Sequence, residues 1–420
     1  MSNLAFLKGP KIRNQPFPNR PIIGDEEKKQ VLDVLNSGNI STFIASPGEH
    51  FLGGEKIREF EKKFASHIGT KFAVTFNSAS SALHAAVIAV GVEPGEEVIV
   101  PPFTFTSTAT SSLMHNAIPV FCDITSDTYC MDSKQIESKI SNLSKAIIPV
   151  HLFGHACDMD EILKISKKHN LKIIEDCAQA LDSEYKNQKL GTLGDCGIFS
   201  FQESKTITTG EGGMLVTNDE NIAEIARMVR NHGEVVQPTM KKRSYRSEFL
   251  GWGYRMTEME AALGIAQLEK LDYLVSERIK LGTFLAREIN QIEGLSHVQH
   301  DFAKHTFWMF GFRYDSEKIG ISRNLFCDAL VAEGIPCAAG YVEPLYMNPL
   351  YIEKRAFAFK HYSGSASYGK GLCPVTESLH EKYLINTLIC RPPATIDDMN
   401  DIVNAIKKII KNKKELQTIE

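Results

Sequence analysis

The sequence predicts an α/β protein with a central, largely parallel sheet, followed by a smaller α+β domain. Short apolar strands alternate with helices between about residues 70 and 220, which is typical of a parallel sheet covered on both faces. From about residue 245 the pattern changes to longer helices with fewer strands. The length of 420 residues is long for one domain and comfortable for two.

The N-terminal part of the chain divides into an arm and two helices. Residues 1–24 are rich in Pro and Asn and predict an extended arm. A helix is expected from Asp25 until Gly38 ends it. The segment Glu55–Gly69 is amphipathic, since its apolar residues recur three or four positions apart. We expect residues 25–274 to form the large domain.

Several predicted strands end at small, polar or aromatic residues. Strands are expected at 71–76, 98–100, 118–123, 146–151 and 172–176, and on both sides of a glycine-rich turn at 210–213. Ligands of such sheets bind beyond the carboxyl ends of the strands. The Asn77–Ser81 turn, Phe105, Asp176 and Ser200–Lys205 lie at or just past these ends, so we expect them to converge on one crevice.

The C-terminal third, residues 275–420, is predicted as the small domain. A long helix should start at Met259 and continue past Tyr273, and the segment His305–Tyr314 has the pattern of a strand. Further helices are expected at Asn324–Glu333 and at 397–410, and residues 335–395 are expected to be irregular.

Composition excludes several classes of protein. The net charge is −4 and no basic face dominates, so nucleic-acid binding is not expected. The uncharged segment Phe103–Cys122 is too rich in Ser and Thr for a membrane span, and the N-terminus lacks the apolar core of a signal peptide. Nine cysteines without a CxxC pair indicate reduced thiols rather than disulfides or a metal site. A cytoplasmic protein without a membrane partner is expected.

The residue types in the crevice suit pyridoxal phosphate. This cofactor needs a lysine for a Schiff base and a carboxylate for the pyridine nitrogen, and Asp176 precedes Lys205 by 205 − 176 = 29 residues. The turn at Ala79 and Ser80, with Ser200, can supply phosphate donors, and Phe105 an aromatic face. Each residue alone has an ordinary explanation: a surface lysine, an N-cap or salt bridge, a plain helix cap, core packing. Their co-occurrence favours the cofactor.

Seven stretches give the chain a close resemblance to a known family. They are NSASSALHAA, PGEEVIVPPFTFTSTA, IPVFCDI, PVHLFGHACDMDEI, IIEDCAQALDSEYKNQKLGTLGD, FSFQESKTITTGEGGMLVTND and YRMTEMEAALGIAQLEKLD. In this order they resemble the sugar aminotransferases of the DegT/DnrJ/EryC1 family, which have the aspartate-aminotransferase-like fold type I. The resemblance covers most of residues 20–275 and implies a seven-stranded, mostly parallel sheet.

The resemblance also implies a role for each candidate residue. Lys205 matches the Schiff-base lysine that also moves the substrate proton. The cofactor-binding matches are Asp176 for the pyridine nitrogen, Gln179 for the 3′ oxygen, Ser200, Ala79 and Ser80 for the phosphate, and Phe105 for stacking on the ring. Family members with dehydratase activity have His in place of this lysine, so Lys205 argues against that chemistry.

Two departures from the family pattern leave the substrate open. Gly253 stands where many members have an Asn that reaches the neighbouring subunit's phosphate. The alternatives are that Asn231 or Arg230 replaces this donor and that the phosphate contact is lost. Gly340 stands where nucleotide-sugar members have a His. The resemblance implies a homodimer with shared active sites, L-glutamate or L-glutamine as donor and a keto-sugar acceptor, with a nucleotide-linked ketosugar of surface-polysaccharide or secondary-metabolite biosynthesis as the first choice. The alternatives are a non-nucleotide acceptor, either a keto-cyclitol or a higher keto-sugar acid, and a non-catalytic regulator or scaffold.

Overall fold

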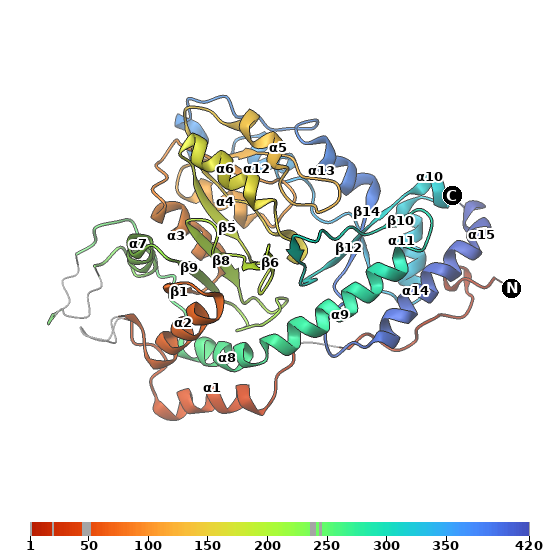
Figure 1. The fold of residues 1–420 in the computed structure, drawn as a ribbon, viewed down its shortest axis with the longest axis horizontal. Coiled ribbons are helices and arrows are strands. Elements are labelled where there is room, and N and C mark those ends of the chain that lie inside the picture. Colours follow the sequence, from red (N-terminus) through yellow and green to blue (C-terminus); the bar gives the residue numbers. More distant parts are fainter. Residues whose placement is uncertain (1, 19–20, 44–51, 236–240, 243–245, 420) are drawn as a thin grey trace.

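The structure, a computed structural model, describes residues 2–18, 21–43, 52–235, 241–242 and 246–419. Its centre is a seven-stranded sheet in the order β1-β9-β8-β5-β4-β2-β3. Figure 1 labels β1, β9, β8 and β5 of this sheet. The strands are β1 (Phe72–Phe76), β2 (Glu97–Val100), β3 (Ile118–Phe121), β4 (Ser144–Ile147), β5 (Lys172–Asp176), β8 (Cys196–Ser200) and β9 (Gly213–Thr217). The predicted α/β architecture is therefore confirmed.

The sheet is parallel except at β9. This strand pairs antiparallel with both β1 and β8, whereas β8, β5, β4, β2 and β3 pair in parallel. Because two antiparallel pairings restore the original direction, β1 is parallel to β8. The carboxyl ends of β1, β2, β5 and β8 therefore meet at one edge of the sheet, as the sequence predicts.

Helices cover both faces of the sheet. Because alternate strand residues point to opposite sides, neighbouring residues of one strand pack against different helices. Ile173 packs into the cluster that contains α2 and α6, and Ile174 into the cluster that contains α3, α4 and α7. The helices of the first half are α1 (Asp25–Ser37), α2 (Glu55–Ile68), α3 (Ala79–Ala89), α4 (Ser107–Met114), α5 (Ser133–Ile136), α6 (Met159–His169) and α7 (Glu220–Arg230).

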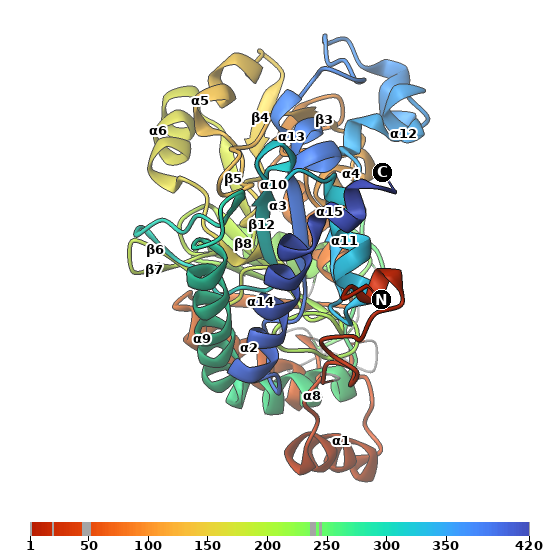
Figure 2. The ribbon, with the colours of Figure 1, turned by 90° about the vertical axis from the view of Figure 1, so that its right-hand side faces the viewer.

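A second, four-stranded sheet lies in the C-terminal part, in the order β10-β12-β14-β13. Its strands are β10 (Leu295–Ser296), β12 (Phe310–Tyr314), β13 (Ala338–Ala339) and β14 (Leu384–Thr387), and a three-stranded sheet joins β6 (Glu184–Tyr185), β7 (Gln188–Lys189) and β11 (Ala303–Lys304). The helices are α8 (Glu258–Glu269), α9 (Leu271–Ile289), α10 (Ser316–Ile319), α11 (Arg323–Ala332), α12 (Pro349–Ile352), α13 (Pro374–Ser378), α14 (Ile396–Lys411) and α15 (Lys413–Gln417). Figure 2 shows α9 and α14 side by side.

Three details differ from the sequence prediction. The strand expected at His305–Tyr314 begins only at Phe310, because Phe307 takes a left-handed conformation (φ 49°) that a strand does not accept. Strand β14, paired with both β12 and β13, lies in the region expected to be irregular. The helix expected past Tyr273 is two helices, which meet at Lys270.

The arm and the C-terminal segments link the two sheets. The Glu333 carboxylate accepts hydrogen bonds from the backbone N–H groups of Ala5 and Ile12, which holds the arm against α11. Helix α9 spans the expected boundary at residue 275, and residues such as Tyr346 and Tyr351 pack beside the large sheet. We propose that the chain consists of an arm (1–24), a large domain (25–274) and a small domain (275–420). Residues 345–373 of the small domain then pack on the large one.

Two further observations concern membranes and thiols. Among the described residues, every helix is too short or too polar to cross a bilayer. All nine cysteines are free thiols, and Cys337 alone is not fully buried.

Candidate active site

One cavity of about 490 Å³ contains every site residue that the sequence predicts. It lies at the carboxyl edge of the large sheet, where β1, β2, β5 and β8 end. Its lining includes Lys205, Asp176, Gln179, Ser200, Ala79, Ser80 and Phe105. The expected convergence is therefore observed, although these residues come from four separate strand ends.

Lys205 follows β8 in a tight turn. Its backbone N–H donates to the Gln202 carbonyl (2.8 Å), and the Ser204 N–H donates to the Gln202 side chain (2.8 Å). The Nζ atom lies 4.1 Å from the ring centroid of Trp308. Burial lowers the pKa of Lys205 to about 8, against the opposing effect of the Asp176 charge. A larger fraction of this amine is thus nucleophilic near neutral pH than of a surface lysine.

Asp176 ends β5 and is almost completely buried. The Thr108 hydroxyl donates to its Oδ2 (2.8 Å) and the Ala178 N–H to its Oδ1 (3.1 Å). Burial nevertheless raises the pKa of Asp176 above its ordinary value, because these donors and the Lys205 charge only partly replace water. A cationic group in the cavity would stabilise this carboxylate in its ionised form.

The residues beside Asp176 form a structural network. Glu175 accepts hydrogen bonds from the N–H groups of Gly191, Leu193 and Gly194, and from the ring of His151. His151, Glu175 and Cys177 offer their ligand atoms within 4.8 Å of one another. The Glu175 oxygens are nevertheless occupied by these donors, so the group fixes the 191–194 loop beneath β5.

The turn between β1 and α3 forms an anion-binding wall. Ser78 caps α3 through its hydroxyl, which accepts from the Ser81 N–H. The N–H groups of Ala79 and Ser80, in the first turn of the helix, have no acceptor within the helix, and both residues line the cavity. Gly213 is required here, since a Cβ would stand 2.5 Å from the Ala79 nitrogen. These donors and Ser200 fit a phosphate.

Gln179 and Phe105 occupy two further parts of the lining. The Gln179 side chain accepts from the Phe153 N–H (3.0 Å) and donates to the Tyr341 hydroxyl (3.0 Å). Phe105 is 61% exposed, so its ring has an open face. Both residues can therefore contact a ligand that enters the cavity.

Trp308, Tyr341 and Thr108 also belong to the site, and sequence reasoning missed them. Trp308 reaches the cavity because the chain turns at Phe307 instead of continuing a strand. Tyr341 follows β13 and is half-buried, and desolvation of its hydroxyl raises its pKa to about 12, so it remains a neutral hydroxyl. A signal existed for Thr108, since it stands in α4 just after Phe105. Tyr341 directly follows Gly340, the position compared with the family's His, whereas nothing local marks Trp308.

A family comparison agrees with this geometry. The DegT/DnrJ/EryC1/StrS aminotransferase family matches residues 21–407. The chain belongs to this family. It is therefore a pyridoxal-phosphate-dependent aminotransferase of fold type I, and the resemblance noted in the sequence is confirmed.

Three individual proteins illustrate the range of relatives. The chain is 38% identical over 335 residues to GDP-perosamine synthase of Caulobacter vibrioides, covering 79% of this chain and 85% of that protein. It is 31% identical over 421 residues to a putative L-glutamine:3-amino-2,3-dideoxy-scyllo-inosose aminotransferase of Streptoalloteichus tenebrarius, covering 98% of each. An aminotransferase from Psychrobacter cryohalolentis has a similar structure, with a TM-score of 0.84 and 30% identity over 94% of this chain and 99% of that one.

The surroundings of Gly253 exclude one of the two expected substitutes for the missing Asn. Arg230 cannot replace the missing Asn, because it is buried against Glu61 and its guanidinium is 2.6 Å from that carboxylate. Asn231 is also buried, and its side chain accepts from Arg255 (2.8 Å). The space beside Gly253 faces His232, whose ring would lie 3.5 Å from an added Cβ.

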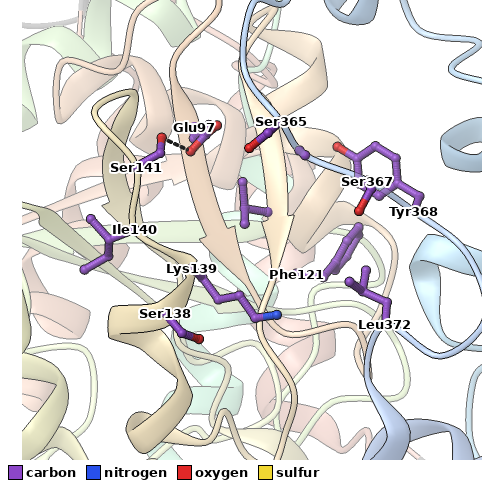
Figure 3. Close-up of a pocket in the computed structure, with 12 residues that line it drawn as sticks. Glu97, Phe121, Ser138, Lys139, Ile140, Ser141, Ser365, Ser367, Tyr368 and Leu372 are labelled. Atoms are coloured by element: carbon purple, nitrogen blue, oxygen red, sulfur yellow. Dashed lines mark hydrogen bonds between the residues drawn. The ribbon is translucent and has the colours of Figure 1, made fainter.

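A second cavity, of about 210 Å³, is separate from the Lys205 cavity (Figure 3). It lies at the start of β2 and is lined in part by residues from the 365–372 segment. Its carboxylate, Glu97, accepts from Ser141 (2.6 Å), Ser144 (3.1 Å) and Tyr362. Lys139 extends along the wall of this cavity. The acceptors of Glu97 are thus occupied by the protein, and this cavity lacks the paired reactive groups of an aminotransferase site.

Proposed function

We propose that this aminotransferase transfers an amino group from L-glutamate or L-glutamine to a keto-sugar, a nucleotide-linked one being the first candidate. The product would belong to the biosynthesis of a surface polysaccharide or a secondary metabolite. The observation that carries the proposal is the single cavity in which Lys205, Asp176 and the Ala79–Ser80 turn meet. The likeness to a GDP-perosamine synthase supports a nucleotide-linked acceptor.

The residues of the cavity fit pyridoxal phosphate. The free N–H groups at the start of α3 and the Ser200 hydroxyl would hold its phosphate, and Asp176 its pyridine nitrogen. Phe105 and Gln179 would contact the ring and its 3′ oxygen. When bound, the cofactor supplies a ring that withdraws electrons as the Cα–H bond of the donor breaks.

Lys205 has two tasks in this proposal. Its neutral amine would bind the cofactor covalently and, once released, would accept the Cα proton of the amino donor. The pKa of about 8 suits both tasks, because amine and ammonium forms are then both accessible near neutral pH. In the second half of the reaction the same amine returns a proton to the carbon of the acceptor.

A keto-cyclitol or a higher keto-sugar acid is the alternative acceptor. The putative scyllo-inosose aminotransferase, which matches 98% of this chain, favours it, as does Gly340 at the place of the family's His. Incubating the pure enzyme with glutamate and each class of ketone, followed by mass spectrometry of the aminated product, separates the two. Amination of only the cyclitol ketone would replace the first candidate by the second.

We also propose a homodimer with shared active sites. Helix α1 packs on α8 but leaves Leu32 and Leu35 about half exposed, an apolar surface suited to a second copy. Light scattering of the purified protein should give twice the chain mass. A fully active monomer would contradict this assignment.

The decisive test replaces the lysine. Lys205→Ala should lower the rate of amino transfer by at least about 10³-fold, because the proton-transferring amine is lost. It should also lose the visible absorbance band that bound cofactor gives in the wild type. Lys139→Ala, which removes a lysine from the second cavity, is the matched control and should behave as wild type. Undiminished transfer by Lys205→Ala would refute the proposed function.

A further inference from the structure

The amine of Lys205 has an unusual environment. Its Nζ lies over the indole face of Trp308, 4.1 Å from the ring centroid, and forms no hydrogen bond or ion pair with any described residue. An ammonium group over an indole is attracted by the negative face of the ring, and the attraction strengthens when water is excluded. The ring is thus a direct contact of this amine, which otherwise feels the charge of Asp176 without an ion pair to it.

The indole ring is itself held in place. Trp308 is 6% exposed, and its Nε1–H donates to the carbonyl of Ser204 (3.0 Å), the residue that precedes the lysine. The left-handed turn at Phe307 brings the ring across from the C-terminal part of the chain. One hydrogen bond therefore connects the ring to the same turn that carries Lys205.

We propose that Trp308 is a positioning residue for Lys205: its indole face stabilises the protonated amine and so sets the pH range in which the lysine is a nucleophile. This inference rests on the proposed function of the cavity. It adds a role for the C-terminal part of the chain in controlling a lysine carried by the large sheet.

The other titratable groups of the cavity allow this contribution to be isolated. Asp176 from β5, Glu211 from the segment before β9 and Tyr341 from the segment after β13 line the same cavity. The Asp176 charge raises the pKa of Lys205 and burial lowers it. Replacing Trp308 leaves all three groups in place, so a change in the amine's titration would report the ring.

The test follows capture of pyridoxal phosphate by the full-length apo-protein. In this step the lysine nitrogen forms a C=N bond to the aldehyde carbon, and the aldehyde oxygen leaves as water. The rate, measured by absorbance between pH 6 and 10, gives the apparent pKa of the amine. The variants are Trp308→Met, which fills much of the volume without a ring, and Trp308→Phe, which keeps a weaker aromatic face. Thermal melting identifies the variants that fold.

Loss of a desolvated cation–π contact should lower the apparent pKa by about one unit in Trp308→Met and by about half as much in Trp308→Phe. An apparent pKa equal to or above that of the wild type in every folded variant would overturn the inference, even if cofactor affinity falls. If Trp308→Met does not fold, the apparent pKa of the amine in Trp308→Phe tests the inference by the same criterion. A wild-type protein that captures no pyridoxal phosphate at any pH would instead refute the proposed function, and the inference with it.

Discussion

Two cavities of this aminotransferase each contain a buried carboxylate, and the two carboxylates differ in how many hydrogen bonds they accept from the protein. At the beginning of β2, Glu97 accepts from two serine hydroxyls and from Tyr362. At the end of β5, Asp176 accepts from only Thr108 and the Ala178 N–H among the described residues, and it lines the open cavity. A fully bonded carboxylate stabilises the fold, whereas an incompletely bonded one keeps capacity for a ligand.

The lysines differ in the same way. Lys139 lies at the edge of the Glu97 cavity, partly open to water, and belongs to a short helical turn at Glu137–Lys139. Lys205 lies against an aromatic ring, and burial lowers its pKa to about 8. A lysine and a carboxylate occur in both cavities, so these residue types alone do not make a reactive site. The difference indicates that amino transfer requires a lysine that is shielded from water and a carboxylate with free capacity in the same cavity.

Of the substitutions that compare the two cavities, replacing Asp176 should reduce the rate of amino transfer most. Asp176→Asn removes the charge that would hold a protonated pyridine nitrogen, and the rate of amino transfer should fall at least about 100-fold. Burial raises the folded-state pKa of this carboxyl, so its ionisation costs stability as pH rises through that pKa. The apo-form of Asp176→Asn should therefore melt at a higher temperature than apo wild type at pH 7.

Calorimetry of both apo-proteins at pH 7 and at pH 3 checks the second part. The difference in melting temperature should shrink at pH 3, where the wild-type carboxyl is protonated in both states. A lower melting temperature for Asp176→Asn at pH 7 would show that Asp176 is structural, like Glu97.

Replacing Thr108 should have a smaller effect, which is on the affinity for the cofactor. Thr108→Val keeps the shape of the side chain but removes the hydroxyl that donates to Asp176, leaving that carboxylate less well held. The affinity for pyridoxal phosphate should fall about tenfold, as for loss of one hydrogen bond to a charged group. Titration of the apo-protein measures this, and Thr108→Ser should restore most of the affinity. Equal affinities in all three proteins would exclude a role for Thr108.

Glu97 should show the smallest effect on activity. Glu97→Gln weakens the hydrogen bonds from Ser141 and Ser144, so unfolding should require about 1–3 kcal/mol less free energy. The rate of amino transfer should stay within about twofold of wild type, because this cavity contributes no reacting group. Denaturant unfolding and steady-state assays test both expectations. A large loss of activity without loss of stability would mean that the second cavity has a function of its own.

The large domain could be predicted well because its signals are local. Each strand of the sheet is a short apolar run that ends in a turn, and parallel strands align their carboxyl ends. Lys205, Asp176 and Ser80 therefore had to approach one another once the strand order was set. The small domain was predicted less well, since β14 lies among prolines and its pattern is weak without its partners.

The sequence by itself determined the family, the α/β sheet and the seven residues now found in one cavity, because these depend on strand ends and on motifs read along the chain. The tertiary structure decided the rest. A left-handed residue at Phe307 places Trp308 over Lys205, and a loop after β13 places Tyr341 beside Gln179. Contacts between residues more than a hundred positions apart leave no periodic signal, so only the folded chain shows them.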